Sequence, residues 1–270
     1  MKPRLLITGA AGRLGTELAS RLREGWDLTL LDRVAPLSGR EGDRIIVGEL
    51  GDGSVLAQAV SGASAVLHLA CRHGEAATFA DTLDTNYIAT LALYEAAIAA
   101  GATDIVFASS NHGWGFYPRS AAPLPGNAPP RPDSWYGISK IWSEAVLAFL
   151  ADSRGVRTTS LRIGFCGPAV PDERCTHMWI GFDDLAQLTR LALARRDAGH
   201  RAFFATGDCV EPFFDNSGAK ALGFVTTQRA EHNLARPGIA GEGKAPGIAG
   251  EAFGGSYAAV NSQCAGSSRP

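Results

Sequence analysis

Short runs of apolar residues alternate with longer amphipathic segments over the first 165 residues of the chain. The apolar runs predict buried strands at residues 4–8, 28–32, 45–47, 65–70, 105–108 and 156–163. The segments between them predict helices through Leu18 and Leu22 and over residues 54–60, 79–100 and 134–153. Strands that alternate with helices form a parallel sheet with helices on both faces. We therefore expect an α/β protein with a doubly wound parallel sheet.

The regularity weakens after Ile163. Residues 164–178 resemble a loop, and the pattern beyond them predicts a helix over 185–195, a strand over 202–205 and a short helix over 217–222. From Pro237 the composition shifts to Gly, Ala and Ser. We expect a dinucleotide-binding core over 1–165, a small substrate-binding portion over 166–236, and a tail over 237–270 that is disordered or draped over a partner.

Composition and charge narrow the class of protein. The chain of 270 residues is 46% hydrophobic and 19% charged, with a net charge of -2, so nothing favours nucleic acid or an anionic membrane surface as a partner. No apolar run reaches the ~20 residues of a membrane span. The five cysteines are scattered, which favours reduced thiols in the cytoplasm. The spacing of the six histidines predicts no metal site.

A glycine-rich loop follows the first predicted strand directly. Gly9 to Gly15 has the spacing GxxGxxG and leads into the first predicted helix. Small residues let the backbone approach a pyrophosphate, and the helix N-terminus offers free N–H groups. Glycine clusters are often only turns, but this position between strand and helix is typical of a Rossmann dinucleotide site. We expect the cofactor to contact Gly9, Ala11, Gly12, Arg13, Leu14 and Gly15.

Acidic and apolar residues at the ends of other strands fit the same site. Asp32 ends the second strand, where a carboxylate can bind the adenosine ribose and repel a 2′-phosphate. The prediction is therefore NAD rather than NADP, although Arg33 weakens the exclusion and Asp32 could simply cap its strand. Asp52 is expected near the adenine. Leu69 and Ala70 are expected over the cofactor groove, whereas His68 before them is more typical of a buried strand residue.

The stretch from Ser109 to Lys140 brings together groups for proton transfer. Two serines end the fifth strand, and Tyr136 lies four positions before Lys140, on the same face of a predicted helix. A tyrosine has a pKa of ~10 in water, and a nearby lysine together with a cationic nicotinamide favours the phenolate. Tyr136 could then take a proton from a substrate hydroxyl, with a serine orienting that oxygen.

Together these motifs resemble the extended short-chain dehydrogenase/reductase family, the NAD-dependent epimerase/dehydratase group, over residues 4–230. The resemblance implies a catalytic triad of Ser110, Tyr136 and Lys140. It also implies cofactor contacts from Ser109, Ile163 and Asn86, although Asn86 could equally be an ordinary polar group of its helix.

Within that family the sequence is most similar to the branch that oxidises uronic acids at the anomeric carbon. The residues that carry this similarity are Phe107–His112, Gly115–Pro118, Arg131–Lys140, Arg162–Gly164 and Trp179 before Asp183-Asp184. The similarity implies that Arg174 binds a substrate carboxylate, a task that suits a guanidinium fork. Asn111 and His112 would contact sugar hydroxyls, while His73 and Phe165 stand where the branch offers small polar contacts to its substrate. Gly181 also replaces a usual serine, and the tail beyond Glu231 matches poorly.

Three hypotheses follow. The first is an enzyme that oxidises galacturonate or glucuronate to an aldarolactone with NAD, as a cytoplasmic homo-oligomer. The second is a nucleotide-sugar epimerase or dehydratase, which the short carboxyl-terminal portion disfavours. The third is a non-catalytic redox-sensing binder, which the intact triad disfavours.

Overall fold

The computed structural model describes residues 2–262 and is built around one parallel sheet of seven strands. The strand order is β3-β2-β1-β4-β5-β6-β9, and every neighbouring pair is parallel. The strands are β1 (Arg4–Thr8), β2 (Asp27–Asp32), β3 (Arg44–Val47), β4 (Ala65–His68), β5 (Asp104–Ser110), β6 (Arg157–Ile163) and β9 (His200–Ala205). This order confirms the predicted doubly wound sheet.

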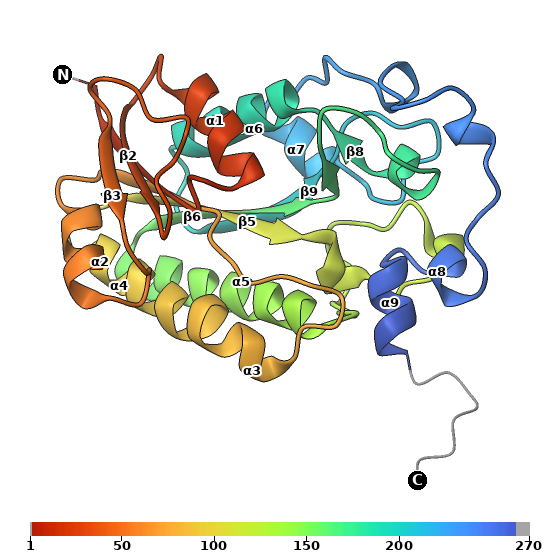
Figure 1. Cartoon of the computed structure of the whole chain (residues 1–270), viewed down its shortest axis with the longest axis horizontal. Helices are drawn as coiled ribbons and strands as arrows, with labels where there is room; N and C mark the ends of the chain where they lie inside the picture. Colours follow the sequence, from red (N-terminus) through yellow and green to blue (C-terminus); the bar gives the residue numbers. More distant parts are fainter. Residues whose placement is uncertain (1, 263–270) are drawn as a thin grey trace, which may run out of the picture.

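Helices cover both faces of the sheet (Figure 1). One face carries α1 (Arg13–Leu22), α6 (Phe182–Ala194) and α7 (Ser217–Ala221). The other carries α2 (Gly53–Val60), α3 (Phe79–Thr82), α4 (Thr90–Ala99) and α5 (Trp135–Arg154). None of the helices that the structure describes is long and apolar enough to cross a membrane.

Alternate residues of the strands build two separate apolar cores. Leu5 and Ile7 of β1 pack toward α1 and α6, whereas Leu6 packs toward α2 and α4. All three are fully buried, and burial of one such side chain contributes roughly 2 kcal/mol to folding. Because both faces are covered, the strands are apolar almost throughout, as the sequence pattern indicated.

The segment predicted as one helix over 79–100 is interrupted. Between α3 and α4 lies a π-helical stretch, Leu83–Ala89. Thr90 Oγ1 donates to the carbonyl of Thr85 (3.0 Å), five residues earlier. The stretch carries Asn86, whose side-chain amide forms hydrogen bonds with the backbone of the loop after β4. The π-helical turn therefore carries a residue with a tertiary contact, which the periodicity of the sequence does not reveal.

A third apolar cluster, made of residues between Trp114 and Phe253, lies beyond the carboxyl ends of the strands. It contains a short strand pair, β7 (Phe165–Cys166) with β8 (Trp179–Ile180), and 3₁₀ turns. These turns are η2 (Asn111–Trp114), η3 (Arg119–Ala121), η4 (Arg174–His177), η5 (Ala230–His232) and η6 (Ile239–Gly241).

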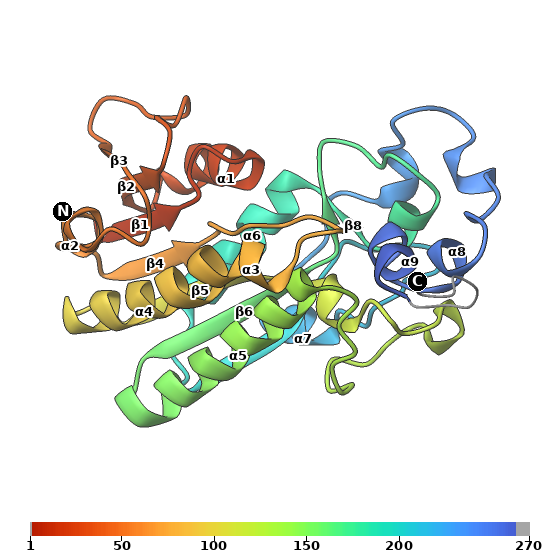
Figure 2. The same cartoon turned by 60° about the horizontal axis from the view of Figure 1, so that its bottom comes forward.

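The structure differs from the expected tail over residues 237–262. This segment contains η6, α8 (Ile248–Glu251) and α9 (Ser256–Asn261), which lie beyond the carboxyl ends of the strands (Figure 2). Ile239 and Phe253 are fully buried in the third cluster. Two well-placed apolar side chains therefore anchor a segment whose Gly- and Ala-rich composition indicated disorder. Residues 263–270 of the predicted tail lie outside the described residues.

Candidate active site

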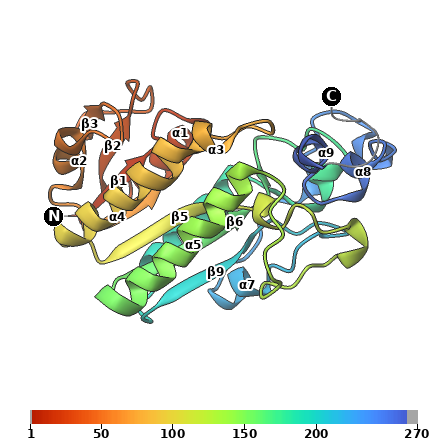
Figure 3. The ribbon, with the colours of Figure 1, turned by 90° about the horizontal axis from the view of Figure 1, so that it is seen from below.

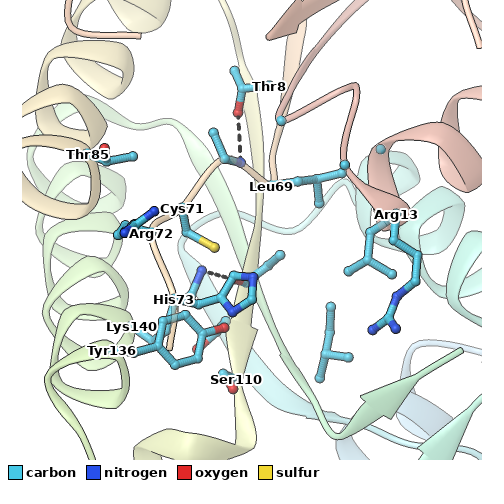
Figure 4. A pocket seen from close by; sticks show the side chains of 18 of the residues that line it. Thr8, Arg13, Leu69, Cys71, Arg72, His73, Thr85, Ser110, Tyr136 and Lys140 are labelled. Carbon is cyan, nitrogen blue, oxygen red and sulfur yellow. Dashed lines mark hydrogen bonds between the residues drawn. The ribbon is translucent and has the colours of Figure 1, made fainter. Parts of the chain in front are cut away.

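A cavity of about 960 Å³ opens at the carboxyl ends of β1, β4, β5 and β6. It lies where strand order reverses between β1 and β4, the usual ligand position in a doubly wound fold. Figure 4 shows Arg13 across this space from His73, Tyr136 and Ser110. Most of the predicted site residues line the cavity: Gly9, Ala11, Gly12, Arg13, Leu14, Gly15, Asp32, Leu69, Ala70, His73, Ser109, Ser110, Asn111, His112, Tyr136, Lys140, Ile163, Phe165 and Arg174.

Gly9 and Gly15 of the glycine loop have no room for a side chain. Gly9 adopts a positive φ of 70°, and a Cβ there would lie 2.7 Å from the backbone nitrogen of Ala70. A Cβ at Gly15 would lie 2.2 Å from the carbonyl oxygen of Gly9. Helix α1 begins after Gly12 with no side-chain cap, so its first N–H groups are free to bind an anion. The loop therefore fits a dinucleotide pyrophosphate.

Asp32 caps the end of its strand and also lines the cavity. Its Oδ2 accepts from the backbone nitrogen of Ala11 (3.0 Å) and its Oδ1 accepts from that of Val34 (3.3 Å), which ties the strand end to the glycine loop. The same side chain lines the cavity beside Arg33. A carboxylate so oriented can accept hydrogen bonds from a ribose.

The serine, tyrosine and lysine converge because β5 and α5 are held together at their ends. Ser134 caps α5 by accepting from Gly137 N (3.0 Å). A Cβ at Gly137 would lie 2.3 Å from the carbonyl oxygen of His112, so only glycine allows this approach. Lys140 is buried, and its Nζ lies 5.3 Å from the ring centre of Tyr136.

The two titratable groups have pKa values shifted in opposite directions. Burial raises the pKa of Tyr136 well above its ordinary value, and a hydrogen bond from Ser110 partly opposes that shift. Burial also lowers the pKa of Lys140. Each shift disfavours the charged form in a dry site. The phenol is therefore protonated in this structure, and a further positive charge nearby would favour its ionisation.

A buried carboxylate orients His112. Asp133, fully buried, accepts from His112 Nδ1 at Oδ2 (2.8 Å) and from Ser134 Oγ at Oδ1 (2.9 Å). Cβ atoms at Gly115 and Gly254 would overlap Asp133 Oδ2, at 1.7 and 2.0 Å. Since Nδ1 is engaged by Asp133, Nε2 is the nitrogen of His112 that can serve a ligand.

Arg174 reaches the cavity from η4. Its Nε donates to the carbonyl oxygen of Phe253 (2.6 Å). Asn111, with its amide oriented to satisfy both neighbours, accepts from Arg174 Nη2 (3.2 Å) and donates to the Ile163 carbonyl (3.2 Å). Burial lowers the pKa of Arg174, and no ion pair among the described residues includes it.

The turn that carries Arg174 is fixed by a neighbouring network. Glu173 accepts from Arg119 Nη1 at both oxygens (2.6 and 3.0 Å) and interacts with His177 Nε2 (3.0 Å). Arg119 lies over the ring of Phe213, 5.0 Å from its centre. The carboxylate of Glu173 is thus already paired with Arg119 and His177 and does not pair with Arg174.

The opposite wall is also cationic. The Arg13 guanidinium lies 5.4 Å from the ring centre of Phe165. Burial lowers the pKa of His73, and the charges of Lys140, Arg13 and Arg72 add to that effect. Phe165 therefore lines the cavity beside the Arg13 guanidinium.

Two predicted cofactor residues lie outside this cavity. Asp52 is exposed and caps α2 by accepting from Ser54 N (2.8 Å) and Val55 N (3.3 Å). Asn86 exchanges hydrogen bonds with the backbone of Arg72 (2.7 and 2.8 Å) and donates to Ser139 Oγ (2.9 Å). Asn86 therefore anchors the loop that borders the cavity.

His68 is a buried strand residue, as expected, and both of its ring nitrogens bind threonine hydroxyls. Its Nδ1 bonds Thr8 Oγ1 (2.7 Å) and its Nε2 bonds Thr90 Oγ1 (3.0 Å). Burial lowers its pKa to about 3, so the ring is neutral.

Several cavity residues were missed by the sequence reasoning. Cys71 and Arg72 lie on the loop after β4, and Ser256 and Tyr257 come from α9. The loop residues follow a strand end and could have been included on that ground. For Tyr257 the signal would have been its aromatic ring, close to Phe253 in an otherwise small-residue segment.

Comparisons with known proteins agree with this geometry. Residues 5–182 match the model of the NAD dependent epimerase/dehydratase family. The chain belongs to this family. Uronate dehydrogenase of Pseudomonas putida is 36% identical over 84% of this chain and 85% of that protein.

Two solved structures extend the similarity to the carboxyl-terminal half. Glucuronic acid dehydrogenase from Chromohalobacter salexigens superposes with a TM-score of 0.88 at 30% identity, over 96% of this chain and 97% of the other. Uronate dehydrogenase from Agrobacterium tumefaciens, as a mutant complexed with NAD, gives a TM-score of 0.87 at 30% identity, over 96% of this chain and 98% of the other.

Proposed function

We propose that the protein oxidises the anomeric carbon of a hexuronate, D-galacturonate or D-glucuronate, to the aldarolactone with NAD. The observation that carries this proposal is Arg174. Its guanidinium lies at the cavity without a carboxylate partner among the described residues, and two of its N–H groups are used by Phe253 and Asn111. A bound carboxylate would supply the missing counter-charge.

In this proposal Tyr136 is the base and Ser110 orients the reacting oxygen. The anomeric O–H gives its proton to the phenolate of Tyr136, and the C–H bond electrons leave as hydride, so that the carbon–oxygen bond becomes the lactone carbonyl. Ser110 donates to the anomeric oxygen while its charge changes. Lys140 lowers the cost of the phenolate by its nearby charge.

The cofactor fits the residues that would hold it. Gly9, Gly12 and Gly15 line the cavity beside the N-terminus of α1, where they would border the pyrophosphate, and Asp32 lines it where it would bind the ribose. When bound, NAD supplies the hydride acceptor and a positive nicotinamide ring. Structures of relatives that carry NAD or act on uronates support this assignment.

Asn111 and His112 are the proposed partners of sugar hydroxyls. Both line the cavity between Arg174 and Tyr136 in the chain of contacts described above. His112 has Nε2 available, because Asp133 engages Nδ1. Phe165 would pack against the sugar or the nicotinamide in place of a polar contact, and His73 would border the sugar on the side of Tyr136.

The test uses the purified full chain with NAD and four sugars. NADH absorbance should rise with galacturonate or glucuronate, and far less with galactose, which differs from galacturonate only in carrying a hydroxymethyl group in place of the carboxylate. UDP-glucose should give no product. Absence of turnover with both uronates would refute the proposal, and conversion of the UDP-sugar would favour an epimerase.

The proposal includes a cytoplasmic homo-oligomer. The four described cysteines are free.

Helices α4 and α5 lie side by side on one face (Figure 3). Exposed apolar side chains lie on α3, on the π-helical stretch after it and on α5: Phe79, Ile88, Trp135, Ile138 and Phe149. Burying such a patch between copies would remove it from water. Light scattering should give a mass above that of one chain, and Ile88→Glu should reduce it.

A further inference from the structure

The carboxyl-terminal segment from Ala252 to Ser262, here called the strap, meets the cavity at several separate points. It lies outside the residues matched by the family model, and none of its residues has a role in the mechanism proposed above. Its helix α9 lies beside the carboxyl ends of the strands (Figure 2). Ser256 and Tyr257 line the cavity.

The strap is fitted closely to the groups proposed to bind the sugar acid. The Phe253 carbonyl accepts from Arg174 Nε (2.6 Å). A Cβ at Gly255 would lie 2.8 Å from Arg174 Nε, and one at Gly254 would lie 2.0 Å from Asp133 Oδ2. Two adjacent glycines therefore let the backbone touch the guanidinium and the carboxylate that orients His112.

Backbone hydrogen bonds secure this approach. Phe253 N donates to the Tyr117 carbonyl (2.9 Å), and Gly254 N donates to the Gly115 carbonyl (2.8 Å). The Phe253 ring stacks on Phe213, with centres 4.8 Å apart. The strap is thus held on the loop after β5 independently of α9.

Tyr257 lies at the end of the cavity that contains His112 and Tyr136. Its ring centre lies 3.9 Å from that of His112 and 6.2 Å from that of Tyr136. Burial raises the pKa of Tyr257, so the hydroxyl is neutral and can donate. One face of the ring is covered by His112, and the rest lines the cavity.

The far end of the strap closes onto the loop after β4. Asn261 Nδ2 donates to the Glu75 carbonyl (2.7 Å). That loop carries His73, whose ring lies 6.2 Å from Tyr136 by centres. The contact joins the strap to the loop after β4, which borders Tyr136 through His73.

We propose that the strap completes the sugar site and that Tyr257 determines its affinity for a pyranose acid. The uncovered part of the ring packs against the sugar, and the hydroxyl donates to one of its oxygens. This inference rests on the proposed oxidation of a hexuronate. The site is then made of polar groups from β5 and α5, a cation from η4 and an aromatic wall from α9, a composition typical of sugar sites.

The test compares strap variants by the KM for galacturonate, kcat, and the Kd for NAD. Loss of an aromatic contact and a hydrogen bond predicts a rise in KM of about tenfold for Tyr257→Ala, with the Kd for NAD unchanged. Tyr257→Phe keeps the ring and should raise KM by about threefold. Val260→Ala, on the exposed side of the same helix, is the matched control and should change neither constant.

A purely structural role would give a different result. It would lower Tm and change kcat and both affinities together, with no selective rise in KM, and that result would overturn the inference. If Tyr257→Ala does not fold, Asn261→Ala should still raise KM selectively by about twofold to threefold, and an unchanged KM there would also overturn it. Wild-type protein that fails to oxidise either uronate would refute the proposed function together with this inference. An active wild type with unaffected variants would refute the inference alone.

Discussion

The ammonium of Lys140 donates to the carbonyl oxygen of Ala108 (2.7 Å), in the strand that ends with Ser109 and Ser110. The positive charge is therefore fixed by β5 itself, one helical turn from Tyr136. The strand that supplies the serine also positions the charge that acts on the tyrosine.

Removal of the phenolic hydroxyl should abolish turnover and spare cofactor binding. Tyr136→Phe is expected to lower kcat by about 1,000-fold, within the range for loss of a general base. Titration with NADH should give an unchanged Kd. If NADH binding is lost with turnover, the role assigned to Tyr136 is wrong.

The rate of uronate oxidation should rise with pH. Burial raises the pKa of Tyr136, so the phenolate fraction grows as pH increases through the neutral and alkaline range. Lys140→Met removes a nearby positive charge, which raises the pKa of the phenol further. The kcat profile of that variant should move to higher pH. A profile that moved to lower pH would contradict the mechanism.

Arg174 should act on the uronate and not on the cofactor. Truncating one partner of a buried charge pair costs about 2–5 kcal/mol, which predicts that Arg174→Ala raises the KM for galacturonate at least about 30-fold. Arg174→Lys keeps the charge but loses the fork, and should give an intermediate KM. The KM for NAD should not change. Equal activity of wild type on galactose and galacturonate would exclude this role.

Asp32 should set the preference for NAD. Asp32→Ala removes the acceptor for Ala11 N and for a ribose hydroxyl, and hydrogen bonds to a charged group contribute about 1.5–3 kcal/mol. The KM for NAD should rise at least about tenfold, while the KM for NADP should fall. The two constants measured side by side provide the check, because a general folding defect would raise both.

Because of His68, the free energy of unfolding should fall as the pH falls. Its native pKa is about 3, against an ordinary value of 6.5. The unfolded chain therefore binds a proton between these values that the native state does not, and stability falls as pH falls below 6.5. The expected loss from this residue is about 2 kcal/mol between pH 7 and pH 5.

Denaturant unfolding at several pH values would measure this loss. His68→Asn should remove about that much of the pH dependence. Equal dependence in wild type and His68→Asn would mean that His68 is not neutral in the native state.

The parts of the site that the sequence could predict are those fixed by parallel strands. The carboxyl ends of such strands share one edge, so Gly9, Asp32, the Ser109-Ser110 pair and, one helix later, Tyr136 could be brought together from apolar runs and spacing. The choice of Ser110 between the two serines came from the family resemblance. Asp52 also follows a strand, but its carboxylate is used by α2. A strand-end position indicates proximity to the edge and not the direction of a side chain.

The rest depended on contacts between distant segments. The pattern of residues 79–100 is helical throughout and does not reveal that Asn86 must hold the loop at Arg72. The strap consists mostly of Gly, Ala and Ser, yet its Phe253 packs in an aromatic cluster built by distant segments. Such pairings depend on three-dimensional packing, which periodicity along one segment does not encode.

The distance along the chain between the glycine loop and the strap has an evolutionary consequence. The glycine loop, which we propose binds the nucleotide, packs in the first apolar core through Ala10 and Leu14. The strap, which we propose borders the sugar, packs in the third cluster through Phe253. Substitutions at the cavity-facing positions of α9 can therefore be selected for a new sugar while folding and redox chemistry are inherited unchanged. A mutant library confined to Ser256 and Tyr257 would sample new substrates on an intact catalyst.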